Sequence, residues 1–243
     1  MDQTEWHQSK KTFHEIDNYE KVKRLVDFEQ GPKLSILDVG CGPGVLGRHL
    51  RNLGHTVTGL DIYTDQTADK DHIINCDINL AWPVADASVD IVITTDVPEH
   101  VYDPTHILHE AYRILKPNGK LIFGVPNHFD LRQRLHTLLG RGIIHWDHVR
   151  FDESGWNYAH IRFFTLPELY AGFRANSWNP DISQFNFMGG GIIPTRFTPS
   201  FIRRFLVKTW PNLFSGKFIF LLSKKMDETD NKSIYLTKTP KGL

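Results

Sequence analysis

The sequence of 243 residues is poor in cysteine, carries no excess of either charge and contains no long hydrophobic run. Its two cysteines, Cys41 and Cys76, give no framework for disulfide bonds, which favours a reducing compartment. The 28 basic and 28 acidic residues balance, so no global electric field draws the chain to nucleic acid or to an anionic membrane. No apolar run approaches the ~18 residues of a membrane span, and the N-terminal segment lacks the apolar core of a signal peptide. We therefore expect a soluble cytoplasmic protein.

Apolar runs typical of buried strands alternate along the chain with amphipathic segments typical of helices. The expected strands are residues 34–40, 55–62, 72–78, 88–96, 120–127, 182–189 and 216–225. The expected helices are residues 10–28, 45–54, 104–116 and 166–177, with Pro-Asn-Gly at 117–119 as a turn. Such alternation predicts an α/β fold in which helices cover both faces of a mostly parallel sheet.

We expect residues 1–225 to form a single domain. Residues 1–30 would make an N-terminal helical cap, and residues 128–164 a substrate-side insertion or lid. The polar tail over residues 226–243 is expected to be disordered, because it has too little apolar surface to pack.

The stretch "LDVGCGPGVLG" at residues 37–47 places four glycines and a proline directly after an apolar run. A tight strand-to-helix turn is one explanation, because Gly40 and Gly42 can adopt backbone angles that are closed to other residues. The other explanation is a ligand that lies against bare backbone beyond the carboxyl ends of the strands, where α/β sheets bind their ligands.

The type of ligand is narrowed by the neighbours of these glycines. No Gly-Lys-Ser/Thr follows, so the loop is not a phosphate-binding P-loop. Gly42, Gly44 and Gly47 permit a shifted match to the dinucleotide motif G-x-G-x-x-G, so glycine spacing alone does not decide the ligand. Asp38 would repel a pyrophosphate but suits a cationic ligand.

Acidic residues end several of the expected strands, where buried parallel strands otherwise carry apolar residues. Asp61 ends the second, Asp77 the third and Asp96 the fourth. A carboxylate in the position of Asp61 accepts hydrogen bonds from a ribose diol, and Asp77 is well placed to meet an adenine edge. The pattern predicts a site for a nucleoside.

The motifs "ILDVGCGPG", "GLDI", "CDI", "SVDIVITTDVPEHV" and "HEAYRILKPNGKLIFGVPN" together resemble those of class I S-adenosylmethionine-dependent methyltransferases. Further along, "VPNHFDLRQRLHTLLGRG" and "HIRFFTLPELYAGFRANSW" resemble the type 11 methyltransferases of the MetW-like and ubiquinone-biosynthesis-like branch. The resemblance implies a Rossmann-like sheet of seven strands whose last strand is antiparallel, which "GKFIFLLSKK" matches. It also implies S-adenosyl-L-methionine as the cofactor.

By position, the resemblance assigns the glycines of the loop to the methionine part of the cofactor and Asp61 to its ribose. Asp77 with Ile78 would lie at the adenine, and Asp96 near the amino-acid end. The full set of expected cofactor-binding residues is Asp38, Gly40, Cys41, Gly42, Gly44, Asp61, Ile62, Asp77, Ile78 and Asp96. One departure is the proline of Pro98-Glu99-His100, because family members often carry Leu-Glu-His there.

Methyl transfer mainly requires alignment of acceptor, methyl group and sulfur, and a hydroxyl acceptor benefits from a base. Three of the thirteen histidines are candidate bases. His100 follows the fourth strand, His128 follows the fifth and His160 precedes "RFF". A surface or core-edge histidine is the simpler explanation for any one of them.

The insertion after the fifth strand invites two further interpretations. His145, His148 and Asp152 could ligate a metal, but no other residues at ligand spacing support them, so we expect no metal. An aromatic lid over the substrate is preferred, with a satellite hydrophobic cluster as the alternative. The lid residues would be Trp146, Phe151, Trp156, Tyr158, Phe163 and Phe164.

The stretch "PSFIRRFLVKTWPNLF" at residues 199–214 mixes aromatic and basic side chains. It is suited to a membrane surface or a lipid-linked substrate. Packing of its apolar side into the core, with a solvated basic edge, is the favoured interpretation.

The resemblance implies methyl transfer to a small-molecule or carrier-linked acceptor, such as a lipid or glycan precursor, most simply at a hydroxyl oxygen. Two alternatives stay open: a non-catalytic, cofactor-binding regulatory partner of MetW type, and an NAD-dependent oxidoreductase. A nucleic-acid acceptor is disfavoured, because no Asn-Pro-Pro-aromatic motif follows the fourth strand and the chain has no basic excess.

Overall fold

The computed structural model describes residues 22–23, 25–62, 64, 69–142, 160–187, 193 and 197–225. The predicted helix over residues 10–28 and the tail from Met226 lie largely or wholly outside these residues. Four of the six predicted lid aromatics and the three predicted metal ligands of the insertion also lie outside them.

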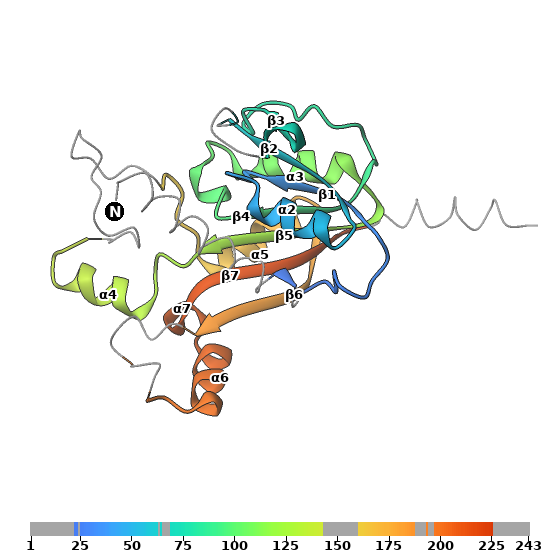
Figure 1. Ribbon diagram of the computed structural model, residues 1–243. Helices are drawn as coiled ribbons and strands as arrows, with labels where there is room; N and C mark the ends of the chain where they lie inside the picture. Colours follow the sequence, from blue (N-terminus) through green and yellow to red (C-terminus); the bar gives the residue numbers. More distant parts are fainter. Residues whose placement is uncertain are drawn as a thin grey trace, which may run out of the picture.

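A seven-stranded sheet forms the centre of the molecule, with strand order β3-β2-β1-β4-β5-β7-β6 (Figure 1). The strands are β1 (Ser35–Val39), β2 (Thr56–Asp61), β3 (Ile73–Asn75), β4 (Val89–Thr95), β5 (Leu115–Pro126), β6 (Trp178–Phe187) and β7 (Ser215–Lys224). The pairs among β1 to β5 are parallel, and β7 runs antiparallel to both β5 and β6. The predicted mostly parallel sheet with an antiparallel last strand is confirmed.

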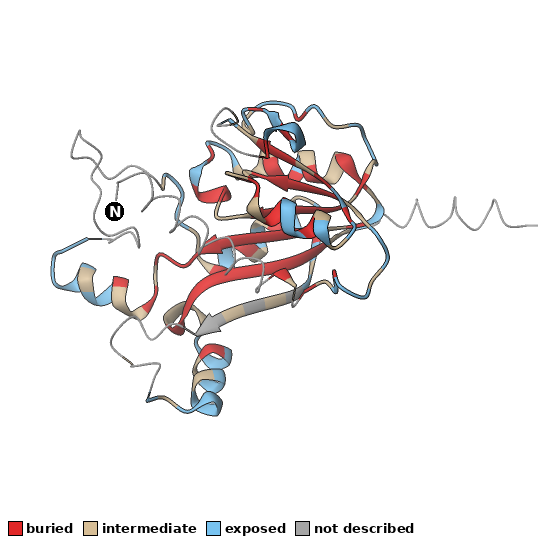
Figure 2. Ribbon diagram, in the orientation of Figure 1, coloured by how far each residue is buried: buried red, intermediate tan, exposed pale blue. Residues whose placement is uncertain are grey.

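Helices pack on both faces of this sheet, and others lie beyond it (Figure 1). They are α2 (Val45–Asn52), α3 (Pro104–Ile114), α4 (Leu131–Leu138), α5 (Leu166–Ala175), α6 (Ser200–Thr209) and α7 (Pro211–Phe214), with the 3-10 turns η1 (Lys70–His72) and η2 (Pro98–His100). Successive strand residues face opposite sides of the sheet. Accordingly, Leu37 of β1 packs with α3 and α5, whereas its neighbour Ile36 packs with α2. Most of the strand surface is buried between these layers (Figure 2).

The end of α3 departs from the prediction. The helix ends at Ile114 and β5 begins at Leu115, with no separate turn between them. Leu115 pairs with Val89, and the next paired residue of β5 is Lys120, which faces Ile91. The predicted Pro-Asn-Gly turn therefore lies within β5. Its residues have no partner in β4, so they interrupt the pairing of the two strands.

Two other boundaries bear on function. β3 ends at Asn75, so Asp77 lies just beyond the strand rather than at its end. β6 begins at Trp178, four residues before the predicted start, because Trp178 and Pro180 already pair with β7.

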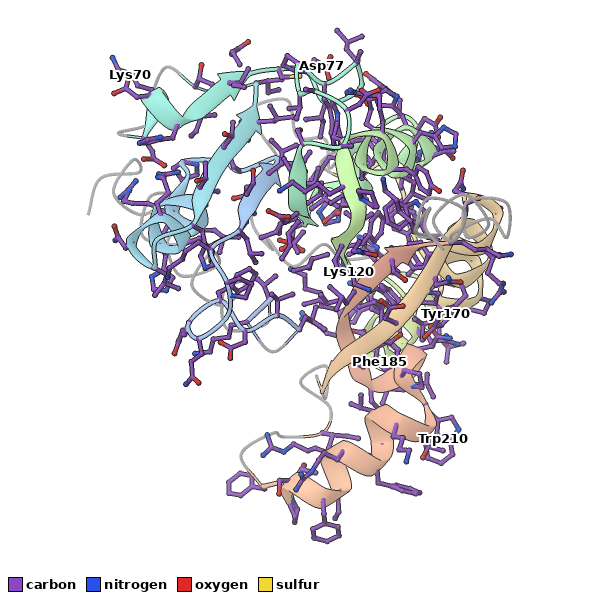
Figure 3. The ribbon with its side chains drawn as sticks, turned by 90° about the vertical axis from the view of Figure 1, so that its right-hand side faces the viewer. Lys70, Asp77, Lys120, Tyr170, Phe185 and Trp210 are labelled. Carbon is purple, nitrogen blue, oxygen red and sulfur yellow. The ribbon has the colours of Figure 1, made fainter. Side chains whose placement is uncertain are left out.

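The segment between β6 and β7 carries α6, which projects beyond the sheet in both views (Figures 1 and 3). β6 is antiparallel to β7 and therefore parallel to β5. The chain thus leaves β6 at the carboxyl edge of the sheet, the edge where β1, β2 and β4 also end.

Candidate functional site

The glycine loop after β1 is built on left-handed backbone. Gly40, Gly42 and Gly44 have φ angles of 67°, 52° and 75°, a region that other residues rarely adopt. The Gly40 amide donates to the carbonyl of Leu60 at 2.8 Å, which ties the turn to β2. A Cβ on Gly40 would lie 2.4 Å from Cγ2 of the buried Val97. At Gly40 the turn and the close packing of Val97 both require glycine, so structural reasons explain it without a ligand.

Asp61 joins the end of β2 to this loop. Its Oδ2 accepts a hydrogen bond from the amide of Gly42 at 2.8 Å. Ile62, the next residue, is exposed. Asp38 is buried in β1 opposite Gly59, and Cys41 packs so closely on Gly59 that a Cβ there would lie 2.4 Å from its Sγ. The structure thus brings together the predicted residues of the first two strands.

Asp69 is a site neighbour that the sequence does not reveal. Its buried carboxylate forms an ion pair with Arg51 of α2, and a Cβ on Gly44 would lie 2.6 Å from its Oδ2. Asp69 therefore braces the glycine loop from the segment between β2 and β3. No local motif marks it, since its role depends on where that segment returns in space.

Asp77 presents a carboxylate at the β3 side of the same edge (Figure 3). Its Oδ1 accepts from the backbone amide of Asn79 at 2.9 Å and from the side-chain amide of Asn79 at 2.8 Å. These hydrogen bonds, the backbone one first, lower the pKa of Asp77 and keep it ionised. Ile78 packs against the main core, whereas Asp77 is exposed.

Asp96 follows β4 with a φ of 58° and forms an ion pair with Lys217 of β7. Lys217 is buried, and sequence reasoning did not single it out. Glu99, three residues after Asp96 and within η2, is also buried. Burial first, and the nearby charge of Asp96 second, raise the pKa of Glu99 well above its usual range. A lysine directly before the apolar run of β7 is the signal that could have indicated this buried charge cluster.

The three candidate histidines come from distant parts of the sequence and form one cluster. His128 Nε2 and His160 Nδ1 lie 2.7 Å apart, within hydrogen-bonding distance. The rings of His100 and His160 pack edge to face at 4.7 Å. The cluster passes from the buried His128 through the half-buried His160 to His100, whose side chain is 43% exposed.

Backbone contacts hold this cluster in place. The amides of Ile161 and Arg162 donate to the carbonyl of Glu99 at 2.9 and 3.1 Å. Pro98 begins η2 and is buried, so the proline starts a short helical turn that buries Glu99 and directs His100 outward. The segment before α5 is thereby fixed against the end of β4.

Two of these histidines, together with Glu99, could also bind a metal ion. Nitrogen and oxygen atoms of Glu99, His100 and His160 all lie within 4.8 Å of one another. His and carboxylate groups at this separation suit a divalent cation. This group differs from the His145, His148 and Asp152 set weighed in the sequence, which falls outside the described residues.

Two lid aromatics are described. The ring of Phe163 packs edge to face on His128 at 4.8 Å, while Phe164 packs against the main core. Phe163 therefore lies directly beside the histidine cluster.

Fold and site together define an α/β protein with a glycine loop, strand-end carboxylates and a histidine cluster at one edge of its sheet. A family model described as a methyltransferase domain matches residues 9–180, and the chain belongs to this family. It is a member of the class I S-adenosylmethionine-dependent methyltransferases, as the motifs predicted.

Relatives with assigned names match part of the chain. The ubiquinone biosynthesis O-methyltransferase of Hydrogenovibrio crunogenus is 31% identical over 117 residues, which cover 44% of this chain and 48% of the relative. The enzyme of the same name from Pseudomonas fluorescens strain Pf0-1 is 30% identical over 102 residues, covering 38% and 44%. The chain spans about half the length of the curated relatives it matches.

Solved structures match most of the chain at lower identity. A SAM-dependent methyltransferase from Archaeoglobus fulgidus superposes with a TM-score of 0.59 at 15% identity, covering 86% of this chain and 94% of the other. The Burkholderia thailandensis 1,6-didemethyltoxoflavin-N1-methyltransferase, solved with its substrate and S-adenosylhomocysteine, gives a TM-score of 0.52 at 16% identity and covers 93% and 92%. These likenesses support the fold.

The residues at the glycine loop fit S-adenosylmethionine. The left-handed glycines leave bare backbone, and Asp38 and Asp61 supply negative charge where a sulfonium cofactor is expected. Asp77 adds an exposed acceptor at the β3 side.

Proposed function

We propose that the protein transfers a methyl group from S-adenosylmethionine to a hydroxyl oxygen of a small-molecule or carrier-linked acceptor, with His160 as the base. The observation that carries this proposal is the hydrogen-bonded pair of His128 and His160, with His100 packed on it, at the carboxyl edge that also holds the glycine loop. The partial likeness to O-methyltransferases of ubiquinone biosynthesis supports an oxygen acceptor.

On the donor side, the glycine loop lines the methionine part of the cofactor, Asp61 holds the ribose hydroxyls, and Asp77 with Ile78 lies at the adenine. Asp96 lies toward the amino-acid end, where its ion pair with Lys217 fixes the orientation of its carboxylate. The bound cofactor supplies an electrophilic methyl group on a sulfonium. The protein contributes alignment, which provides much of the rate in such displacements.

On the acceptor side, His160 takes the proton of the acceptor hydroxyl. His128 is a positioning residue, because its ring is buried and hydrogen-bonded to His160 and so fixes the orientation of the His160 ring. His100 lies at the exposed end of the cluster and passes the proton to solvent. A positioned base of this kind typically contributes about 10²–10⁴-fold to rate.

A divalent cation held by Glu99, His100 and His160 is the second candidate, favoured by the spacing of their ligand atoms. Such a cation would lower the pKa of an acceptor hydroxyl without a base. Dialysis against EDTA separates the two. Activity that survives chelation supports the base, whereas activity lost and then restored by magnesium or zinc assigns the cluster to a metal.

Turnover tests the proposal as a whole. The purified protein is incubated with S-adenosylmethionine and a fractionated cell extract, and S-adenosylhomocysteine is measured. We expect extract-dependent formation that Asp61→Ala strongly lowers when S-adenosylmethionine is subsaturating. Cofactor binding by calorimetry without turnover in any fraction would instead identify a regulatory cofactor-binding protein. Binding of NAD and not of S-adenosylmethionine would identify an oxidoreductase.

A further inference from the structure

Helix α6 exposes its large apolar side chains, whereas a helix that packs on a core buries them. Phe201 and Phe205, one turn apart, are 67% and 59% exposed, and Phe197, Ile202 and Trp210 are exposed as well. Figure 2 shows most of the helix exposed, and Figure 3 shows Trp210 at the end of the helix that adjoins the sheet. The favoured expectation from the sequence, that this apolar side packs into the core, is wrong for these residues. Of the helix, only Val207 is buried.

Basic side chains flank this aromatic side: Arg204 and Lys208 are exposed and lie within about 60° of Phe201 around the helix, while Arg203 is half-buried. Arg203, Arg204 and Lys208 line an open cavity of about 830 Å³ between the helix and β6, together with Ser200, Val207 and Phe185 of β6. None of the ion pairs found within the described part of the chain involves these three cations. Their charge is therefore not neutralised by a neighbouring acid in that part of the protein.

The charge around α6 is strongly local. Residues 182–225 contain no aspartate or glutamate, although the whole chain has a net charge of zero. The same residues include seven cations: Arg196, Arg203, Arg204, Lys208, Lys217, Lys224 and Lys225. This segment thus combines exposed aromatic rings with an excess of positive charge, although Lys217 is paired with Asp96.

We propose that α6 docks on the surface of an anionic lipid bilayer. Exposed phenylalanine and tryptophan rings enter the boundary between headgroups and acyl chains, where aromatic residues are favoured. The long arginine and lysine side chains reach from the same helix to lipid phosphates. No helix in the described part of the chain is long and apolar enough to cross a membrane, and an in-plane helix does not need to be.

Charge favours a bilayer over other occupants of this surface. A second copy of the chain would bring like charges together, since both copies carry the same basic face. An anionic bilayer offers apolar depth and negative charge in one surface, which matches the exposed aromatic rings of α6 and the exposed Arg204 and Lys208 beside them. Docking would turn the carboxyl edge of the sheet toward the membrane, because α6 follows the end of β6. The inference does not depend on the identity of the methyl acceptor.

Vesicle flotation with the full-length chain tests this proposal. We expect binding to vesicles of phosphatidylcholine with phosphatidylglycerol, at least tenfold weaker binding to phosphatidylcholine alone, and loss of binding as salt screens the charges. The double variant F201S/F205S should lower binding to the anionic vesicles at least tenfold. Leu80→Ser, which removes an equally exposed apolar side chain far from α6, is the matched control and should bind as the parent does.

The charge reversal R204E/K208E, at two exposed positions of α6, should abolish the preference for the anionic vesicles. Circular dichroism of each variant checks that the fold is retained, which exposed substitutions should allow. Equal binding by the parent and F201S/F205S, or no binding to either vesicle, would overturn the proposal. So would a concentration-dependent dimer in light scattering that F201S/F205S dissociates, because that result would assign the surface to a second copy. Methyl transfer is not measured in these assays, so their failure is distinct from failure of the proposed function.

Discussion

The glycine loop and the histidine cluster lie at the same edge of the sheet but are constructed differently. The loop is made within one short stretch, and its shape depends on backbone angles, on the Gly42 amide and on the space beside Val97. The cluster is made of side chains from η2, from the end of β5 and from the segment before α5. A contiguous backbone site can be recognised in a sequence, whereas a site of converging side chains needs the fold.

The two regions should also respond differently to substitution. A side chain of the cluster can be removed with little strain, so the loss should appear in catalysis. A change in the loop forces backbone and core to move, so the loss should appear first in stability. The four predictions below test this contrast.

His160→Ala should lower kcat by about 10²–10⁴-fold and leave cofactor affinity unchanged, because the variant loses the base but keeps the loop. Steady-state kinetics and calorimetry measure the two effects. His72→Ala, at an exposed histidine of η1, is the control and should act as the parent. Weakened cofactor binding in His160→Ala with an unchanged kcat would place the cluster on the donor side.

Gly40→Ala should destabilise the protein by about 2–5 kcal/mol. Left-handed backbone costs an alanine about 1–2 kcal/mol, and the clash with Val97 adds about 1–3 kcal/mol. Gly140→Ala is a matched control, because Gly140 has a φ of 72° but open space around its Cβ position. Urea unfolding should show only the smaller cost for Gly140→Ala. Equal destabilisation by Gly40→Ala and Gly140→Ala would mean that the Val97 side chain moves aside at no cost in stability.

Asp61→Ala should weaken cofactor affinity by about 1–3 kcal/mol, from hydrogen bonds lost at the ribose. Asp61→Asn keeps an oxygen that can accept from the Gly42 amide but removes the negative charge. It therefore distinguishes the effect of the hydrogen bond to the loop from the effect of the charge. Calorimetry with S-adenosylhomocysteine should rank the parent first, Asn second and Ala last. Parental affinity in Asp61→Ala would show that the ribose lies elsewhere.

The smallest effect is expected at Asp130, the fully buried N-cap of α4 on the acceptor side. Burial raises the pKa of Asp130 above its usual range, because the ionised form is poorly solvated there. The contribution of Asp130 to the stability of the fold is therefore fully present below the pKa that its carboxyl has in the unfolded chain. It is lost as the pH rises through the higher pKa of this carboxyl in the folded protein.

Asp130→Asn should remove this loss and keep an acceptor for the Gln133 amide. The variant should gain stability relative to the parent as the pH rises above about 4, the ordinary aspartate pKa. Asp103→Asn changes the exposed cap of α3 and provides the comparison. Urea unfolding across pH measures both. A parallel pH dependence for the parent and Asp130→Asn would contradict burial as the cause.

The sequence predicted the glycine loop more fully than the histidine cluster, for reasons that individual residues make clear. Hydrophobic alternation and the glycines located β1, β2, β4 and the loop, because those signals are local. Asp69 and Lys217 were missed, since each gains its partner, Arg51 or Asp96, only when distant segments meet. The histidines were named singly, and nothing in the sequence indicated that His128 and His160 form a pair.

Helix α6 shows a different limit. Its apolar stripe is visible in the sequence, but periodicity does not say whether a stripe faces the core or the outside. Only the burial of Val207, against the exposure of Phe201 and Phe205, shows which side of α6 faces in.

Phe187 of β6 and Ser215 of β7 are paired neighbours in the sheet, so the segment that carries α6 leaves and returns at almost one point. Closing a shorter loop between two adjacent antiparallel strands costs little entropy. The segment can therefore lengthen, shrink or be exchanged during evolution while the strands on either side keep their register. In this architecture the segment that carries α6 is replaceable, whereas the glycine loop, tied to β2 and packed on Val97, is not.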